Sequence, residues 1–206
     1  MMSYRIVLGL SLTLFLLVGA IGWAANMPKP AALVGETFTS APPPEPTRSA
    51  ETTTAVSPSI GAIDPQWLQR VSDATMIPIR MLQAYATAAA EVDHAQPRCK
   101  LGWNTLAAVG YIESKHGSHG GAHIGTDGNL IGTIIGPRLD GNGDGVADPD
   151  NIDDAAYTAA NYLCAGGRDL TTAGGWSAAV LSYNNDVKYV EEVRSESALY
   201  ATKSDG

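Results

Sequence analysis

Positive charge is scarce in this chain, and no cluster of Lys or Arg occurs along it. The 206 residues include 13 basic and 21 acidic side chains, which gives a net charge of -8. Recognition of nucleic-acid phosphates needs clustered basic side chains, so the composition excludes a general DNA- or RNA-binding role. The length also excludes two large domains, because one compact domain occupies ~100–150 residues.

Cysteine is equally scarce, since Cys99 and Cys164 are the only two. Neither has Cys or His neighbours at the spacing of a zinc site. An even cysteine count in an oxidising compartment is typical of one structural disulfide. We therefore predict a bridge between these two residues.

Charged residues are missing from residues 6–25, which are rich in Leu, Val and Ile and follow Arg5. A run of ~20 apolar residues can cross a membrane as a helix. The single Arg on the short side favours a cytoplasmic N-terminus. Residues 1–25 are therefore predicted to anchor the protein in the cell membrane by a single pass, with an extracytoplasmic domain. The alternative is a signal peptide cleaved near Ala24, which would release a secreted protein.

Aromatic residues and helical periodicity are nearly absent from residues 26–62, where Pro recurs among Ala, Ser and Thr. Such a stretch buries too little apolar surface to offset the entropy of its chain. We predict a disordered linker here, followed by a folded domain at residues 63–202.

Strand-like alternation is also lacking from residues 63–202, whereas helical spacing of apolar residues recurs. Six helices are expected, and the domain is predicted to be all-α. Cap and breaker residues mark most of their boundaries. The expected helices begin near Pro65, Pro78, Asn104, Asn151, Trp176 and Asp186, and the third of them runs to His116.

Glu113 is the most informative residue of the third expected helix. It follows Leu106 and Val109 at helical spacing, so its carboxyl group is expected on the face that the apolar residues bury. A carboxylic acid held partly out of water retains its proton more readily and can act as a general acid. The alternative is an acidic residue at the edge of this face that pairs with Lys115 or Arg98.

Residues 99–117, with the sequence CKLGWNTLAAVGYIESKHG, resemble the catalytic-glutamate helix of the lytic murein transglycosylases of actinobacteria-type cell walls. Two later segments, NIDDAA at 151–156 and AVLSYNN at 179–185, are similar to the same family. The resemblance implies a lysozyme-like helical fold. It also implies cleavage of the MurNAc–GlcNAc β-1,4 bond of peptidoglycan, with formation of 1,6-anhydro-MurNAc, in cell-wall remodelling.

By this resemblance Glu113 would protonate the glycosidic oxygen and then act as a base while the MurNAc 6-hydroxyl closes the anhydro ring. No cofactor is required for that chemistry. Ser114, Tyr183 and Asn184 match the Glu-Ser and Tyr-Asn motifs of the family and would bind the glycan strand. Periodicity alone allows Tyr183 to pack in the core against Trp176 instead.

The Gly-x-Met-Gln-x-x-Pro-x-Thr-Trp segment of that family has no counterpart here, since no Met follows Met81 and no Gln follows Gln96. Instead, GPRLDG runs directly into NGDG. This departure favours an alternative function, a catalytically impaired relative that binds glycan or a wall-synthesis partner. A third interpretation is a hydrolase of the same fold, which would need Asp127 or Asp140 as a second carboxylate.

Glycine is abundant in residues 117–150, which hold 10 of the 22 glycines. Within this segment, Asp140, Asn142, Asp144 and Asp148 occupy ligand positions of a calcium loop. The twelfth position lacks the usual Glu. Two interpretations therefore remain: a structural calcium site, or an acidic turn at the start of a helix. The acidic residues that could replace the missing ligand are Asp150, Asp153 and Asp154.

Three histidines, His116, His119 and His123, fall in the first part of the same segment. Their glycine-rich surroundings would leave metal ligands unfixed. Solvated loop histidines are therefore favoured over a zinc site.

Overall fold

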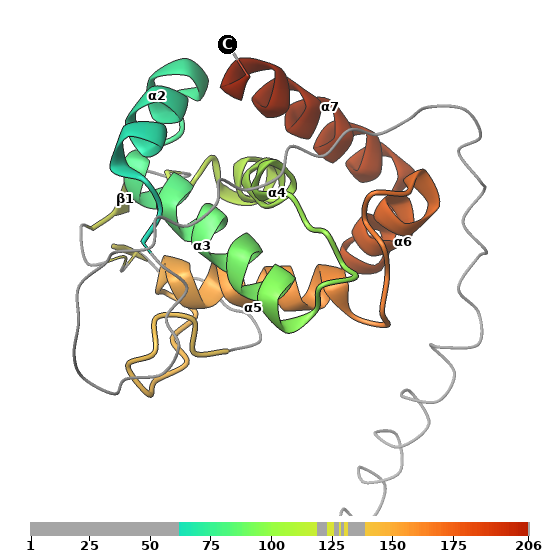
Figure 1. Cartoon of the computed structure of the whole chain (residues 1–206), viewed down its shortest axis with the longest axis horizontal. Coiled ribbons are helices and arrows are strands. Elements are labelled where there is room, and N and C mark those ends of the chain that lie inside the picture. Colours follow the sequence, from blue (N-terminus) through green and yellow to red (C-terminus); the bar gives the residue numbers. More distant parts are fainter. Residues whose placement is uncertain (1–61, 119–122, 126–127, 129, 132–138, 206) are drawn as a thin grey trace, which may run out of the picture. The chain divides into compact units, whose positions relative to one another are not determined.

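A computed structural model describes residues 62–118, 123–125, 128, 130–131 and 139–205. This part of the chain forms six helices and one pair of two-residue strands, so the predicted all-α class is confirmed (Figure 1). The predicted membrane anchor, residues 1–25, and the predicted linker, residues 26–62, lie outside the described residues except for the last residue of the linker. Within the described part, no helix is long and apolar enough to cross a membrane.

Local capping chemistry places most of the helix starts where the sequence predicts them. Asp64, Asn151 and Asp186 each accept a hydrogen bond from the backbone N–H two residues later, which satisfies a donor that the helix itself cannot. The helices are α2 (Pro65–Thr75), α3 (Ile79–Ala95), α4 (Trp103–Ser114), α5 (Ile152–Cys164), α6 (Ala173–Tyr183) and α7 (Val187–Ser204).

Helix α4 differs from its prediction at both ends. It begins at Trp103 rather than after a cap at Asn104, and it ends at Ser114 rather than His116. Asn104 is buried inside the helix, where its Nδ2 donates to the hydroxyl of Ser197 on α7 at 2.8 Å. A hydrogen bond between distant helices therefore overrides the preference of Asn for a capping position.

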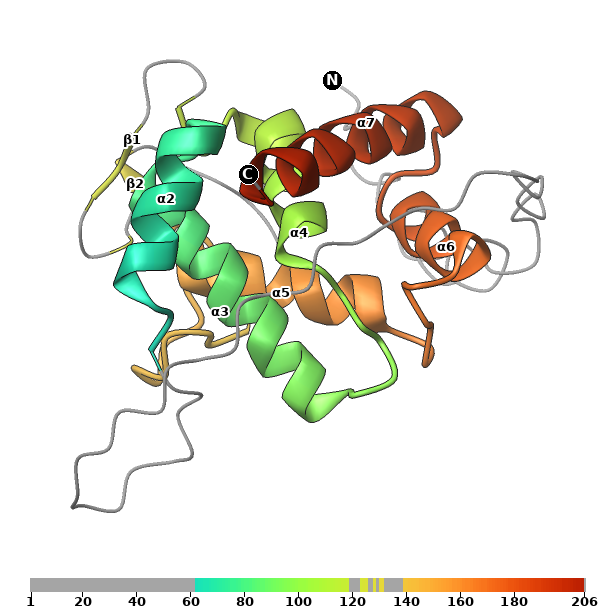
Figure 2. The same ribbon diagram turned by 45° about the horizontal axis from the view of Figure 1, so that its top comes forward.

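Helix α4 forms the centre of the domain, in contact with α3, α5 and α7 (Figures 1 and 2). Residues 103–109 are all buried, so this helix has no single apolar face. The Trp103 ring meets the ring of Trp67 edge-on, with centroids 5.5 Å apart. On another side, Trp176 Nε1 donates to Thr105 Oγ1 at 3.1 Å, so even the polar side chains of α4 are paired within the core.

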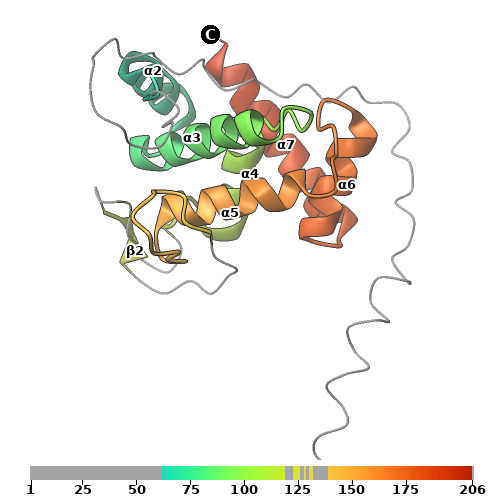
Figure 3. The same cartoon turned by 60° about the horizontal axis from the view of Figure 1, so that its bottom comes forward.

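Helices α3 and α5 lie side by side (Figure 3). A disulfide joins the ends of this layer. The predicted bridge between Cys99 and Cys164 is confirmed, with Cα atoms 5.4 Å apart and a sequence separation of 65. The carbonyl of Cys99 also accepts a hydrogen bond from the N–H of Leu170 at 2.8 Å. The connection before α4 is thus tied to the end of α5.

A short hairpin precedes α5, which the sequence did not reveal because each strand has only two residues. Strand β1 (His123–Ile124) pairs antiparallel with β2 (Leu130–Ile131). Between them, the carbonyl of Gly128 accepts from the N–H of Ile152 at 2.8 Å, which attaches the hairpin to the start of α5. Gly128 has φ +85 and packs against Arg80, where a Cβ would overlap the guanidinium group.

Candidate active site at the end of helix α4

Glu113 lies in the last turn of α4, where the central helix leaves the core. Its side chain is exposed, so the expectation of a buried carboxyl group is wrong. The expectation fails because α4 is buried on all sides over residues 103–109, and helical spacing cannot identify one buried face in such a helix. Exposure leaves the carboxyl group accessible from solution.

A buried tyrosine from α7 holds this carboxyl group. The Tyr189 hydroxyl donates a hydrogen bond of 2.7 Å to Glu113 Oε1. Burial, and then the hydrogen bond to Glu113, raises the pKa of Tyr189, so its hydroxyl keeps the proton and remains a donor at neutral pH. Lys115, one of the two basic residues considered as a partner for Glu113, has its ammonium over the ring of Tyr111, 3.6 Å from the ring centroid.

Two more tyrosines extend from Tyr189, and we call Tyr162, Tyr183 and Tyr189 the tyrosine cluster. The rings of Tyr183 and Tyr189 stack with centroids 6.4 Å apart and planes at 15°. Tyr162, 44% exposed, meets Tyr183 edge-on at 5.7 Å. Burial, and then the charge of Glu113, raises the pKa of Tyr183 to about 12. The tyrosine cluster and Glu113 therefore share one site built from α4, α5, α6 and α7.

The sequence motif identified Tyr183 but missed Tyr162 and Tyr189. Tyr183 is the last residue of α6, and α7 begins at Val187, so the chain turns back over only three residues. That short connection brings Tyr189, in the first turn of α7, beside Tyr183. A tyrosine shortly after the Tyr-Asn motif, on the far side of a tight turn, is the signal that could have found it.

The other two predicted glycan ligands stand next to this site. Asn184 follows Tyr183, is exposed, and ends α6 through its N–H, which donates to the Val180 carbonyl at 3.0 Å. Ser114 follows Glu113. Its hydroxyl donates to the carbonyl of Gly110 at 3.1 Å and accepts from the N–H of Gly117 at 2.8 Å. The Ser114 hydroxyl thus closes the end of α4 and thereby supports the position of Glu113.

This arrangement suits proton transfer by one carboxyl group. In the described part of the chain, Tyr189 is the residue that forms a hydrogen bond with Glu113. One oxygen is thereby oriented by a neutral donor, and the exposure of the side chain leaves the carboxyl group open to a reactant. Of the two acids considered as a second carboxylate, Asp140 uses its oxygens for the N–H groups of Gly143 and Gly145, at 2.7 and 2.9 Å. The other, Asp127, lies outside the described residues.

The predicted calcium loop is organised by its own backbone. Besides Asp140, Asn142 and Asp144 accept hydrogen bonds from the N–H groups two residues further on, each at 2.8–2.9 Å. Asp148 does the same for the N–H of Asp150 at 2.9 Å. These are Asx turns, in which a side-chain oxygen imitates a backbone carbonyl. Among the described residues, no group of three or more His, Cys, Asp or Glu is arranged to hold a metal ion.

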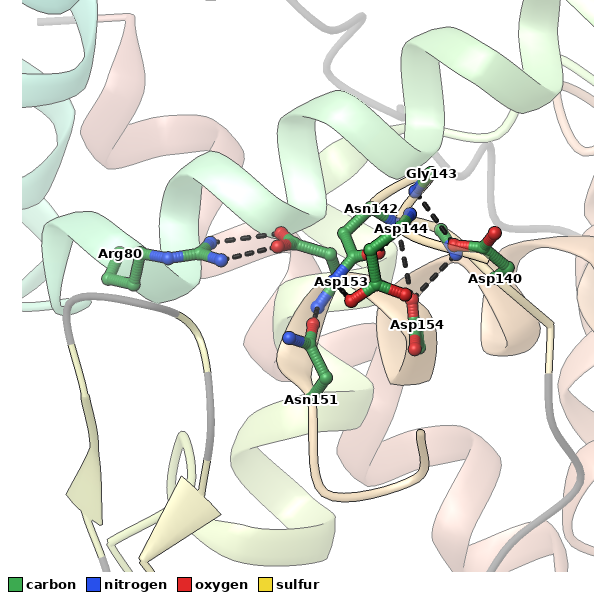
Figure 4. A network of polar contacts seen from close by, with 9 residues as sticks. Arg80, Asp140, Asn142, Gly143, Asp144, Asn151, Asp153 and Asp154 are labelled. Atoms are coloured by element: carbon green, nitrogen blue, oxygen red, sulfur yellow. Dashed lines mark hydrogen bonds and ion pairs between the residues drawn. The ribbon is translucent and has the colours of Figure 1, made fainter. Parts of the chain in front are cut away.

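Asp154, from the first turn of α5, lies at the centre of this loop (Figure 4). It is 1% exposed, and its two carboxylate oxygens accept from the N–H groups of Gly141, Asn142 and Asp148 at 2.7–3.1 Å. Its neighbour Asp153 turns the other way and forms a two-pronged ion pair with Arg80 of α3. The two acids therefore attach both the 140–148 loop and α3 to the start of α5.

The three histidines have different surroundings. His116 is buried, with 8% of its surface exposed, so the expectation of a solvated loop histidine is wrong for this residue. His123 is described only as a residue of β1, and His119 lies outside the described residues.

No protein-family model, curated protein or solved structure matches this chain.

Proposed function

We propose that residues 63–202 form a lytic transglycosylase domain, with a lysozyme-like arrangement of helices, that cleaves peptidoglycan glycan strands. The observation that carries the proposal is the exposed carboxyl group of Glu113, which Tyr189 holds at the end of the central helix. Tyr183 and Asn184, which match the Tyr-Asn motif of the transglycosylases, stand at the same site. Aromatic rings with a few polar groups are common in binding sites for small molecules and sugars.

The proposed reaction uses one carboxyl group twice. Glu113 gives its proton to the glycosidic oxygen as the bond from MurNAc C1 to that oxygen breaks. Its carboxylate then takes the proton of the MurNAc 6-hydroxyl as O6 bonds to C1 and closes the anhydro ring. No water is consumed, and Glu113 ends in its starting protonation state. A hydrolase would instead use a second carboxylate to activate water or to attack the sugar.

A second candidate is a catalytically impaired relative that binds glycan at the cell surface. The absence of the Gly-x-Met-Gln segment favours this function. No Met follows Met81 and no Gln follows Gln96 in the sequence. In this case the tyrosine cluster would still bind sugar, but Glu113 would lack the partner groups that hold the strand in the reactive position.

We also propose that residues 1–25 anchor the protein in the membrane and place the domain outside the cytoplasm. The disulfide between Cys99 and Cys164 supports export, because such bridges persist in oxidising compartments. Structural calcium at residues 140–148 stays a prediction. Titration calorimetry of the full chain with Ca²⁺ tests it, with Asp144→Asn as the variant that should weaken binding.

The test of the enzymatic proposal is mass spectrometry of the products formed from purified peptidoglycan. The full chain should release anhydro-muropeptides, and Glu113→Gln should release none while remaining folded. Glu191→Gln, which changes an exposed glutamate on α7, is the matched control and should behave as the unaltered chain. Products with a free reducing end would indicate a hydrolase. Absence of products together with sedimentation on peptidoglycan would indicate the impaired relative.

A further inference from the structure

A buried chain of hydrogen bonds follows Glu113 at the end of α4. His116, three residues later, has Nδ1 3.3 Å from the Tyr85 hydroxyl of α3. On the other side of its ring, Nε2 is 3.0 Å from the Tyr200 hydroxyl of α7. One imidazole therefore joins the end of α4 to two neighbouring helices.

A neutral imidazole has one donor nitrogen and one acceptor nitrogen, so His116 accepts from one tyrosine hydroxyl and donates to the other. Burial raises the pKa of both Tyr85 and Tyr200, so each hydroxyl keeps its proton at neutral pH. Either tautomer of the ring therefore links α3 to α7 at the end of α4.

Aromatic and charged groups from three helices face this imidazole. The rings of Tyr85, Tyr111 and Tyr200 lie with centroids 5.5–6.0 Å from that of His116. Lys115 is the nearby positive charge, and Glu196 stands beyond Tyr200. Burial, and then Lys115, lowers the pKa of His116 from 6.5 to about 4, so the ring is neutral at physiological pH.

The backbone at His116 also depends on this anchoring. Lys115, His116 and Gly117 all have left-handed φ angles, of 52, 57 and 73. Residues other than glycine adopt this conformation when surrounding contacts fix it. The N–H of His116 returns to the carbonyl of Gly110 at 3.1 Å, which reverses the chain immediately after Glu113.

A glycine makes room for this arrangement. Gly110 lies one helical turn before Glu113, and a Cβ there would overlap the hydroxyl of Tyr85. Tyr85 therefore reaches His116 by crossing α4 at the point where the helix has no side chain. Glycine, two tyrosines and histidine are thus fitted to each other around the last turn of α4.

We propose that His116 is a positioning residue, whose neutral ring, clamped between Tyr85 and Tyr200, fixes the end of α4 and so the place of the Glu113 carboxyl group against Tyr189. Its consequence for catalysis rests on the proposed transglycosylase function. Its consequence for the geometry of Glu113 does not, because the contacts that carry it involve no substrate.

Three variants of the full chain separate positioning from simple folding. His116→Phe keeps an aromatic ring but removes both hydrogen bonds. His116→Asn keeps a side chain that donates and accepts, and Asn tolerates the left-handed conformation. His94→Phe is the matched control, because His94 is exposed on α3.

Two measurements are made on each variant. The first is the ¹³C NMR signal of the Glu113 carboxyl group in the glutamate-labelled chain, assigned with Glu113→Gln. We expect His116→Phe to change the chemical shift of this signal, and His116→Asn to change it less. His94→Phe should leave the signal where it is in the unaltered chain. The second is the rate of anhydro-muropeptide formation. We expect kcat of His116→Phe to fall about ten- to a hundredfold with KM changed by less than about twofold, since misplacement of a reacting group mainly affects the chemical step.

An unmoved Glu113 signal in folded His116→Phe would overturn the proposal, as would ¹⁵N shifts showing that His116 titrates near 6.5. If His116→Phe does not fold, Tyr200→Phe removes one hydroxyl of the chain and must move the signal in its place. A moved signal in a chain that forms no anhydro products would support positioning and reject the proposed enzyme, so the two failures are distinguishable.

Discussion

Replacing Gly110 by Ala is expected to destabilise the protein, although Ala is the better helix former. In an exposed helix interior the change would stabilise by about 1 kcal/mol. In α4, a Cβ at this position would overlap the Tyr85 hydroxyl and lie 2.7 Å from the Tyr85 Cζ atom. Tyr85 is 3% exposed, so its ring cannot move aside into solvent. Core packing therefore predicts that Gly110→Ala destabilises the protein, whereas helix propensity predicts that it stabilises the protein.

The expected size follows from two costs and one gain. Overpacking of a filled core costs about 1–3 kcal/mol. Displacing Tyr85 also breaks its hydrogen bond to His116 Nδ1, and a buried polar atom left unpaired costs about 1–3 kcal/mol. Subtracting the helix-propensity gain of about 1 kcal/mol leaves a net loss of about 3 kcal/mol. For a domain of this size the midpoint of thermal unfolding should fall by about 10 °C.

Urea unfolding followed by circular dichroism measures this difference in the full chain. Gly174→Ala is the matched control, because Gly174 lies in α6 and a Cβ there meets nothing within 4 Å. It should be neutral or stabilise by up to about 1 kcal/mol. Adding Tyr85→Phe to Gly110→Ala should cost less than the two separate losses combined, since one of them already removes the hydroxyl that the other displaces.

An Ala variant at position 110 that is as stable as the unaltered chain would refute the reasoning. It would mean that Tyr85 can leave α4 without loss, so the hydrogen bond to His116 would contribute nothing to stability. Strictly additive losses in the double variant would refute it as well, because the two residues would then not be in contact.

Three further predictions concern stability. Reduction of the Cys99–Cys164 bridge should lower the free energy of unfolding by about 4 kcal/mol, since it releases a loop of sequence separation 65; equal urea midpoints with and without reductant would contradict this. Between pH 6.5 and 4 the unfolded chain binds a proton that folded His116 refuses, so stability should fall by about 3 kcal/mol as the pH drops, and His116→Asn should flatten this part of the profile. Asp154→Asn should cost about 2–4 kcal/mol and speed hydrogen exchange at the three N–H groups that Asp154 holds, and unchanged exchange would count against its role.

Features set by neighbouring residues were predictable from the sequence. Asp64, Asn151 and Asp186 accept from the N–H two residues onward, so each helix start depends on a few consecutive side chains. The cysteine pair was predictable for a different reason, because two cysteines allow only one intramolecular bridge.

Features that depend on residues distant in the sequence could not be predicted. Asn104 has the side chain of a cap, but its partner Ser197 is 93 residues away, and no local pattern reveals that pairing. For the same reason helical spacing located Glu113 but gave the wrong exposure for its side chain, which depends on where α4 leaves the core. The contacts of Glu113 with Tyr189 and of His116 with Tyr200 depend on the packing of α7 beside α4. Local chemistry therefore predicted the elements, and tertiary packing decided what surrounds the carboxyl group.

The disulfide has a consequence for how this chain tolerates changes in length. It fixes the two ends of the segment between Cys99 and Cys164 with Cα atoms 5.4 Å apart, whatever lies between them. The entropy of closing such a ring varies only with the logarithm of its length, so about 30 residues more or fewer would change its free-energy contribution by only about 0.3–0.5 kcal/mol. The crosslink itself therefore adds little to the free-energy cost of an insertion or deletion before α5. The loop that differs most from the transglycosylase pattern lies within this ring, so the disulfide places little constraint on its length.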